Sequence, residues 1–168
     1  PYQFSKVRAE REAWSFIERH RPDWDLVVIN PAVVMGPSMT PALNTSNSIV
    51  AALLNGTYPG IVSIGVPVVD VRDVADAHIR AMTTAPASGR YICSAETTSI
   101  RRIVSILREN GYDGFKLPTL ALDNRFGTAL MKLASWTQDR GTGQYLRSNL
   151  GPPLVFDNGR IRRQRGMQ

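Results

Sequence analysis

Apolar residues recur along this chain with two different periods, which predicts both helices and strands. Residues 2–20 carry apolar positions at helical spacing between charged residues, among them Val7, Ala13, Trp14 and Ile17, and Pro22 ends this helix. The next apolar run, DLVVIN (residues 25–30), is instead short, continuous and β-branched. Such a run is typical of a strand buried in a parallel sheet.

The alternation of helix and strand continues to the end of the chain. Further strands are predicted at VPVVDV (66–71) and GRYICSA (89–95), with FKLPT (115–119) as another candidate. Further helices are predicted at NSIVAALLNG (47–56), RDVADAHIRAMTTA (72–85), TTSIRRIVSILRENG (97–111) and from residue 121 to about residue 139. Prolines and glycines predict loops at PAVVMGPSMTP (31–41) and RGTGQYLRSNLGPP (140–153). This alternation implies an α/β protein with a parallel sheet.

Two of the predicted helices have an apolar stripe that is expected to face the core. In the helix over 97–111 the stripe consists of Ile100, Ile103, Val104 and Leu107. In the helix over 72–85 it consists of Val74, Ala75, His78, Ile79 and Met82. His78 is therefore interpreted as a hydrogen-bonded packing residue and not as a catalytic base.

Composition and charge narrow the class of protein. A chain of 168 residues with 43% hydrophobic and 20% charged residues is ordinary for a globular domain with its own core. We expect a cytoplasmic protein, because no run approaches the roughly 18 apolar residues of a membrane span, no secretory signal is visible, and Cys93 is the single cysteine. No cluster of His, Cys and Asp has the spacing of metal ligands.

Half of the net charge of +6 lies in residues 157–168, which contain Arg160, Arg162, Arg163 and Arg165 but only one aspartate. A nucleic-acid patch is one interpretation of this cluster. Aromatic residues are not interleaved with the arginines, so no base-stacking platform is suggested. The sequence favours a solvated helical turn, and neither a nucleic acid nor a membrane is predicted as a partner.

Tyr2 and Lys6 are the candidate catalytic residues, because their i, i+4 spacing places them on one face of the first helix. A phenol holds its proton near neutral pH, and a nearby ammonium group favours the phenolate. A phenol in such a setting becomes usable in general acid–base catalysis. On its own the pattern Y-x-x-x-K arises often by chance, and a surface Tyr–Lys pair is the alternative.

The segments around this pair resemble one enzyme family in their order along the chain. They are YQFSK (2–6), AEREAW (9–14), LVVINPAVVMGP (26–37), VVDVRDVADAHIRA (68–81), GRYICSA (89–95) and FDNGRIRRQ (156–164). Together they resemble the second half of an extended short-chain dehydrogenase/reductase, in the NAD-dependent epimerase/dehydratase superfamily. The dihydroflavonol reductase, cinnamoyl-CoA reductase and methylglyoxal/aldehyde reductase group is the most similar.

The resemblance implies a role for individual residues. Tyr2 would donate the proton to the substrate carbonyl oxygen, and Lys6 would hold the ribose hydroxyls of the nicotinamide nucleotide. Pro31 and the backbone near Val33 would meet the nicotinamide carboxamide, and Ser46 would contact the cofactor's phosphates. The resemblance favours NADP(H) over NAD(H) as the cofactor and a small carbonyl compound as the substrate.

The residues that line the substrate pocket are less clearly indicated. Met35, Met39 and Pro67 could line it, since methionine adapts to varied apolar shapes, or they could be ordinary core residues.

The resemblance also implies the fold and the extent of the chain. We expect the second half of a doubly wound, Rossmann-type parallel sheet, with a small C-terminal substrate-binding region. Residues 1–35 would supply the Tyr–Lys helix and the following strand, and 36–168 would be mostly substrate-binding, with 66–83 and 90–95 returning to the sheet. The nearest match to a phosphate-binding glycine motif, GTG at 141–143, follows a helix and has Leu146 at the third position, so we reject it.

Three functions remain open at this point. The first is the C-terminal half of an NAD(P)H-dependent carbonyl reductase, which takes its catalytic Ser or Thr and its phosphate loop from upstream and is inactive in isolation. The second is a nucleotide-sugar epimerase or dehydratase of the same superfamily, which uses the same Tyr–Lys pair. The third is a non-catalytic fragment without the cofactor's phosphate site, for which poor affinity for NADPH is expected.

Overall fold

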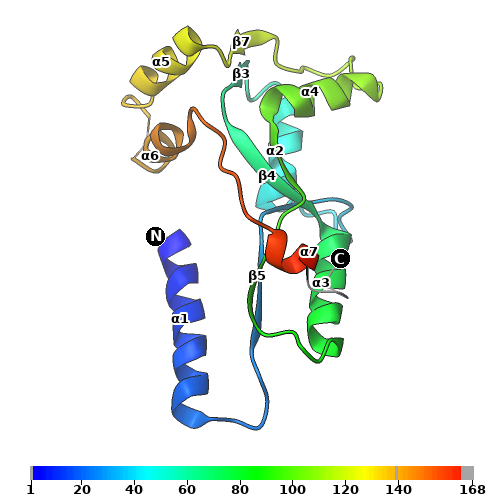
Figure 1. Ribbon diagram of the computed structural model, residues 1–168. Coiled ribbons are helices and arrows are strands. Elements are labelled where there is room, and N and C mark those ends of the chain that lie inside the picture. The colour runs from blue at the N-terminus through cyan, green and yellow to red at the C-terminus, as the bar shows by residue number, and fades with distance from the viewer. Residues whose placement is uncertain (1, 139, 164–168) are drawn as a thin grey trace. The chain divides into compact units, whose positions relative to one another are not determined.

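The chain folds into two compact units, each assembled from segments that are distant in the sequence (Figure 1). The structure is a computed structural model that describes residues 2–138 and 140–163, so Arg165, the last arginine of the predicted solvated turn, lies outside the described residues. Unit 1 comprises residues 1–31, 72–93 and 157–168, and unit 2 comprises residues 32–71 and 94–156. The proposed division into cofactor-binding and substrate-binding regions stays a prediction.

Unit 1 is built on one pair of parallel strands, β1 (Val27–Pro31) and β5 (Gly89–Cys93), in register from Val27 opposite Gly89 to Pro31 opposite Cys93. Its helices are α1 (Tyr2–His20), α3 (Val71–Thr83) and α7 (Gly159–Arg163). Successive residues of a strand point to opposite faces. Arg90 of β5 pairs with Glu10 of α1, whereas Tyr91 packs under Arg160 of α7. Helices therefore cover both faces of the pair, as in a doubly wound sheet.

Arg160 attaches the C-terminal helix to the start of β5. Its guanidinium donates hydrogen bonds to the carbonyl oxygens of Ser88 at 2.7 Å and Arg90 at 3.2 Å, and it lies 4.9 Å from the ring centroid of the fully buried Tyr91. Gly89, between the two acceptors, has φ +71°, and a Cβ there would lie 3.2 Å from this guanidinium. A residue without a Cβ therefore suits both the backbone and the close approach.

Unit 2 contains two small sheets. In the first, β4 (Gly65–Asp70) pairs in parallel with β2 (Val33–Met35) and antiparallel with β6 (Glu96–Ser99). In the second, β3 (Gly60–Val62) pairs in parallel with β7 (Leu120–Leu122). The helices are α2 (Thr45–Leu54), α4 (Ile100–Glu109), α5 (Arg125–Ala134) and α6 (Arg140–Asn149).

The core of unit 2 joins residues from several of these elements. Its buried members are Leu53, Ile61, Ile64, Val66, Ile100, Val104 and Leu150. Ile103 and Leu107 pack against this cluster, so the inward stripe predicted for α4 is confirmed. The predicted α/β class with parallel strands is confirmed as well.

Three predicted elements are wrong, and the helix predicted over 97–111 begins only at Ile100, because residues 97–99 belong to the strand β6. FKLPT (115–119) is not a strand; the strand here is β7, which begins at Leu120. The helix predicted from residue 121 begins instead at Arg125, because residues 121 and 122 belong to β7. The loop predicted over 31–41 contains the strand β2. The loop predicted over 140–153 begins with the helix α6, in which a Cβ on Gly143 would lie 2.3 Å from the carbonyl oxygen of Ser135. Glycine at 143 thus permits a close approach inside a helix.

The inward stripe predicted for α3 is also wrong. Ala77 is the buried residue of this helix, and Ile79 and Met82 are 59% and 85% exposed. His78 is exposed, and its Nδ1 lies 2.7 Å from the carbonyl oxygen of Val74, so it is hydrogen-bonded but not packed. The buried face of this helix, around Ala77, is therefore narrower than its apolar pattern indicated.

Truncation of a core side chain tests this description of unit 2. Leu53→Ala is expected to lower the free energy of unfolding by about 2–5 kcal/mol, because Leu53 is 0% exposed and its removal leaves a cavity. Urea denaturation measures the change. Leu43→Ala is the matched control, since Leu43 is 66% exposed, and an equal loss in both variants would contradict the packing described.

An ion pair joins α4 to the segment that precedes α5 and gives a second test. Arg101 donates two hydrogen bonds to the carboxylate of Asp123, at 2.6 and 2.5 Å. These hydrogen bonds hold the pKa of Asp123 below its ordinary value, against the opposing effect of partial burial. A carboxylate with a lowered folded-state pKa stabilises the fold above its unfolded pKa of about 4, and this contribution is lost as pH falls through the folded-state pKa.

Asp123→Asn is therefore expected to lower the melting temperature at about pH 7, with a difference from the parent that shrinks toward about pH 3. Thermal denaturation across this pH range measures it. Asp113→Asn makes the same change of charge at an exposed position and serves as the control. A difference for Asp123→Asn that is independent of pH would contradict the role of the ion pair.

Candidate functional site

Tyr2 and Lys6 lie one turn apart at the start of α1, on the same face. The Nζ atom of Lys6 lies 5.4 Å from the centroid of the Tyr2 ring. Tyr2 is 72% exposed, and every residue from position 2 to position 9 is exposed. The structure thus places the phenol and the ammonium group together, with both accessible to a ligand.

Pro31 is the last residue of β1 and lies opposite Cys93 in the parallel pair. Both residues are therefore at the carboxyl edge of the strands, where open α/β sheets bind their ligands. Burial, and to a smaller extent the negative charge of Asp73, raise the pKa of the Cys93 thiol. The thiol stays protonated near neutral pH and is not an activated nucleophile.

Val33 and Ser46 lie in unit 2, where β2 and α2 adjoin. Val33 is the first residue of β2, and Ser46 is in the first turn of α2. The side chain of Asn47 donates a hydrogen bond to the carbonyl oxygen of Gly36, just past β2, at 3.3 Å. The start of α2 is thereby tied to the carboxyl end of this strand.

The amino terminus of α2 has the polarity that an anion requires. Asn44 caps the helix by accepting a hydrogen bond from the backbone N–H of Asn47 at 2.7 Å. The first turn has no acidic residue, and the amide groups there have no partner within the helix. Backbone donors and the helix dipole at such an end favour a phosphate or a carboxylate.

The three candidate substrate-lining residues occupy different environments within unit 2. Met35, in β2, is half-buried and packs against the hydrophobic core. Met39, in the segment before α2, is fully exposed, and Pro67 lies in β4 opposite Thr97 of β6. A role for these residues toward a substrate stays a prediction.

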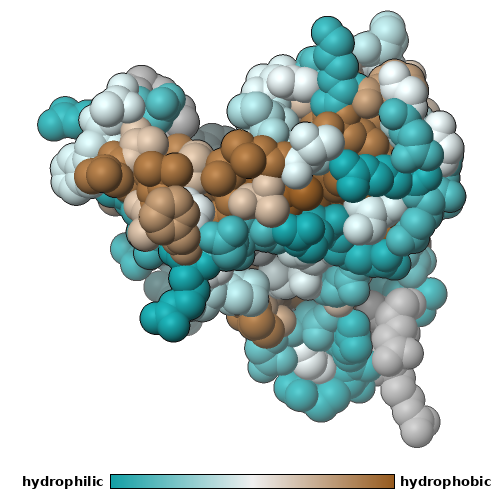
Figure 2. Space-filling model, turned by 90° about the horizontal axis from the view of Figure 1, so that it is seen from above, coloured by the Kyte–Doolittle hydropathy of each residue, from teal (hydrophilic) through white to brown (hydrophobic). Residues whose placement is uncertain are grey.

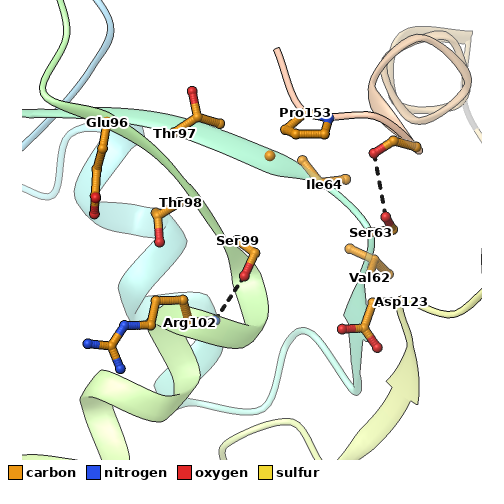
Figure 3. Close-up of a pocket in the computed structure, with 12 residues that line it drawn as sticks. Val62, Ser63, Ile64, Glu96, Thr97, Thr98, Ser99, Arg102, Asp123 and Pro153 are labelled. Atoms are coloured by element: carbon orange, nitrogen blue, oxygen red, sulfur yellow. Dashed lines mark hydrogen bonds between the residues drawn. The ribbon is translucent and has the colours of Figure 1, made fainter. Parts of the chain in front are cut away.

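A hollow on unit 2 has none of the predicted site residues in its lining. It has a volume of about 440 Å³ and is lined by segments 62–65 and 96–99 together with Arg102, Asp123, Gly151 and Pro153. Figure 3 shows Glu96, Thr98 and Arg102 along one side and Asp123 and Ser63 along the other. Its lining mixes polar side chains with the apolar Val62, Ile64 and Pro153, and most of these residues are half-buried. The hydroxyl of Ser99 accepts a hydrogen bond from the backbone N–H of Arg102 at 3.1 Å.

The described part of the chain contains neither a metal-ligand cluster nor a membrane-spanning helix. No group of three or more His, Cys, Asp or Glu side chains is placed there to hold a metal ion. None of the helices described is long and apolar enough to cross a membrane.

The sequence pattern did not identify Glu10 as a residue of the site. Its carboxylate accepts hydrogen bonds from Asn30 of β1 and Arg90 of β5 and so joins the helix of the Tyr–Lys pair to the strands.

The chain is similar to several reductases in sequence. A cinnamoyl-CoA reductase of Medicago truncatula (CAD2) is 41% identical over 126 residues, which are 74% of this chain and 37% of that protein. A ketoreductase of Aspergillus niger (azaE) is 42% identical over 116 residues, which are 64% of this chain and 34% of that protein. The chain thus spans little more than a third of the length of these relatives. No family model matches it.

The chain is also similar in fold to solved structures, one of them a reductase. The yeast methylglyoxal/isovaleraldehyde reductase Gre2, solved as a complex with NADPH, is 32% identical with a TM-score of 0.59, over 66% of this chain and 35% of that one. The structure of gox2253 matches 99% of this chain and 51% of its own with a TM-score of 0.69; at 21% identity it shows the fold alone. Fold and sequence relatives together show that the chain belongs to the extended short-chain dehydrogenase/reductase superfamily.

Proposed function

We propose that this chain is the C-terminal half of an NADP(H)-dependent carbonyl reductase, which reduces a ketone or an aldehyde to an alcohol. The observation that carries the proposal is the Tyr2–Lys6 pair, with the ammonium nitrogen 5.4 Å from the phenol ring and both groups exposed at one end of α1. A phenol beside an ammonium group suits proton donation to a developing alkoxide. The similarity to reductases favours reduction over the epimerase or dehydratase chemistry that uses the same pair.

Within each unit taken by itself, the residues suit one part of a nicotinamide nucleotide, which supplies a hydride when it is bound. Lys6 offers N–H donors to the ribose hydroxyls, and Pro31 lies at the carboxyl edge of the β1–β5 pair. Ser46, in the first turn of α2, adds a hydroxyl to the backbone donors of a helix amino terminus without acidic residues. NADP(H) is preferred to NAD(H) because the similar Gre2 was solved with NADPH.

The roles of the two catalytic residues follow from their chemistry. The Tyr2 hydroxyl donates its proton to the carbonyl oxygen as negative charge develops there. Lys6 stabilises the phenolate that remains and holds the cofactor's ribose, so that it acts both in binding and in proton transfer. The substrate is a small carbonyl compound, and Met35, Met39 and Pro67 are proposed to line its site.

Replacement of the phenol tests the proton donor. In the whole protein, Tyr2→Phe is expected to lower kcat for NADPH-dependent reduction of a ketone or aldehyde by about a hundredfold or more, because general acid catalysis is lost. The dissociation constant for NADPH should change little. Tyr112→Phe removes the hydroxyl of another part-exposed tyrosine and is the control. Turnover of Tyr2→Phe within a few-fold of the parent would refute the assignment.

Lys6 is tested separately because two roles are assigned to it. Lys6→Met is expected to weaken NADPH binding and to lower kcat together, since one ammonium group serves both. Fluorescence titration gives the dissociation constant, and steady-state kinetics give the rate. Lys132→Met, at an exposed position of α5, is the matched control. A variant that loses rate but keeps its affinity for NADPH would contradict the dual role.

A further inference from the structure

The helix that carries the Tyr2–Lys6 pair is packed along only part of its length. All residues from position 2 to position 9 are exposed, and no residue of α1 is fully buried. The half-buried positions begin at Glu10 and continue with Ala13, Trp14, Ser15 and Ile17. The first two turns of α1 therefore extend beyond the part that contacts the strands of unit 1.

Glu10 stands at the boundary between the packed and exposed parts of α1. Its Oε1 accepts hydrogen bonds from Nε and Nη2 of Arg90 in β5, at 2.7 and 2.5 Å, and from Nε1 of Trp14 at 3.3 Å. Its Oε2 accepts a hydrogen bond from Nδ2 of Asn30 in β1 at 3.4 Å. One carboxylate thus joins the helix to both strands. Among the described residues, the hydrogen bonds from α1 to β1 and β5 all end on it.

The electrostatics of this carboxylate agree with a structural anchor. The side chain of Glu10 is 15% exposed, and that of Arg90 is 59% exposed. Burial raises the pKa of Glu10, but the hydrogen bonds from Arg90, Trp14 and Asn30 outweigh it and the pKa is below its ordinary value. The group is ionised near neutral pH, when charge-assisted hydrogen bonds to Arg90 are strongest.

The position of Glu10 along the helix determines what it controls. Tyr2, Lys6 and Glu10 follow one another at i, i+4 spacing and so lie along one side of α1. At 1.5 Å per residue, Tyr2 lies about 12 Å along the axis from Glu10, so a tilt of about 5° at Glu10 moves the phenol by about 1 Å. A misplacement of about 1 Å in a catalytic group costs about a hundredfold in rate.

We propose that Glu10 is the positioning residue of the Tyr2–Lys6 pair, because it fixes the direction of α1 on the β1–β5 strands through Arg90 and Asn30. The effect of Glu10 on catalysis rests on the proposed function, whereas its effect on the placement of α1 does not. This role requires no contact between Glu10 and either residue of the pair. Glu10 acts on Tyr2 and Lys6 through the helix that carries all three residues.

Five variants of the whole protein test the proposal: Glu10→Gln, Arg90→Met, the double variant, Arg90→Lys, and Glu18→Gln as the control. Glu18 is exposed on the same helix, so its replacement makes the same change of charge. Hydrogen exchange of the α1 amides is measured without substrate, and kcat and KM are measured with NADPH and a carbonyl substrate. Arg90→Lys, which keeps a cation at this position, tests for rescue.

Glu10→Gln is expected to speed exchange of the α1 amides about tenfold, with exchange in α4 of unit 2 unchanged. It should also lower kcat about tenfold or more with little change in the KM for the carbonyl substrate, since the reacting groups are misplaced and substrate contacts remain. The double variant should lose no more than Glu10→Gln alone, because the two residues act as one unit. Arg90→Lys should keep part of the α1 amide protection and part of the kcat that Arg90→Met loses.

The two readouts separate this inference from the proposed function. Unchanged exchange in α1 of Glu10→Gln overturns the positioning role, whatever the activity. Normal kcat with faster exchange also overturns it, since the helix would then move without effect on the pair. A parent protein that does not oxidise NADPH overturns the proposed function, while faster exchange in Glu10→Gln would still support placement of α1 by Glu10.

Discussion

Parallel strand pairing is the constraint on which the rest of this structure depends. Parallel neighbours cannot be joined by a tight turn and need a crossover of a dozen or more residues. Between β1 and β5 the chain therefore makes a long excursion, from residue 32 to residue 88, and much of unit 2 is built within it. A second excursion, over residues 94–156, completes unit 2 before α7 returns to β5. The discontinuity of both units is a consequence of this pairing.

The elements that the sequence predicted well are those with strong local signals. The helices α1 and α4 have regular apolar spacing, and each ends two residues before one that terminates helices, Pro22 or Gly111 with φ +85°. The strands β1 and β5 are short β-branched or aromatic runs bounded by polar or glycine residues. In these cases the residues that specify the helix or strand lie within about ten positions of one another, and tertiary packing favours the same structure.

The elements that the sequence missed are specified by partners elsewhere in the chain. β7 is a strand because Leu120–Leu122 pairs with Gly60–Val62, which no local pattern indicates. The glycines of α6 read as a loop, yet Gly143 allows this helix to approach Ser135, whose hydroxyl and carbonyl oxygens accept hydrogen bonds from Arg147. The loop was predicted from the turn preference of glycine, whereas glycine at 143 is required by the close approach of α6 to Ser135.

The candidate site shows the same division between local and distant information. The relation of Tyr2 to Lys6 is set by helix geometry alone, so the spacing in the sequence was enough to predict it. The direction in which the helix presents that pair is set by Glu10 through Asn30 and Arg90, which are 20 and 80 residues away. A sequence motif can thus identify two candidate catalytic groups but not the contacts that place them. It follows that Arg90 of β5, remote from the pair in sequence, helps to determine how α1 presents that pair.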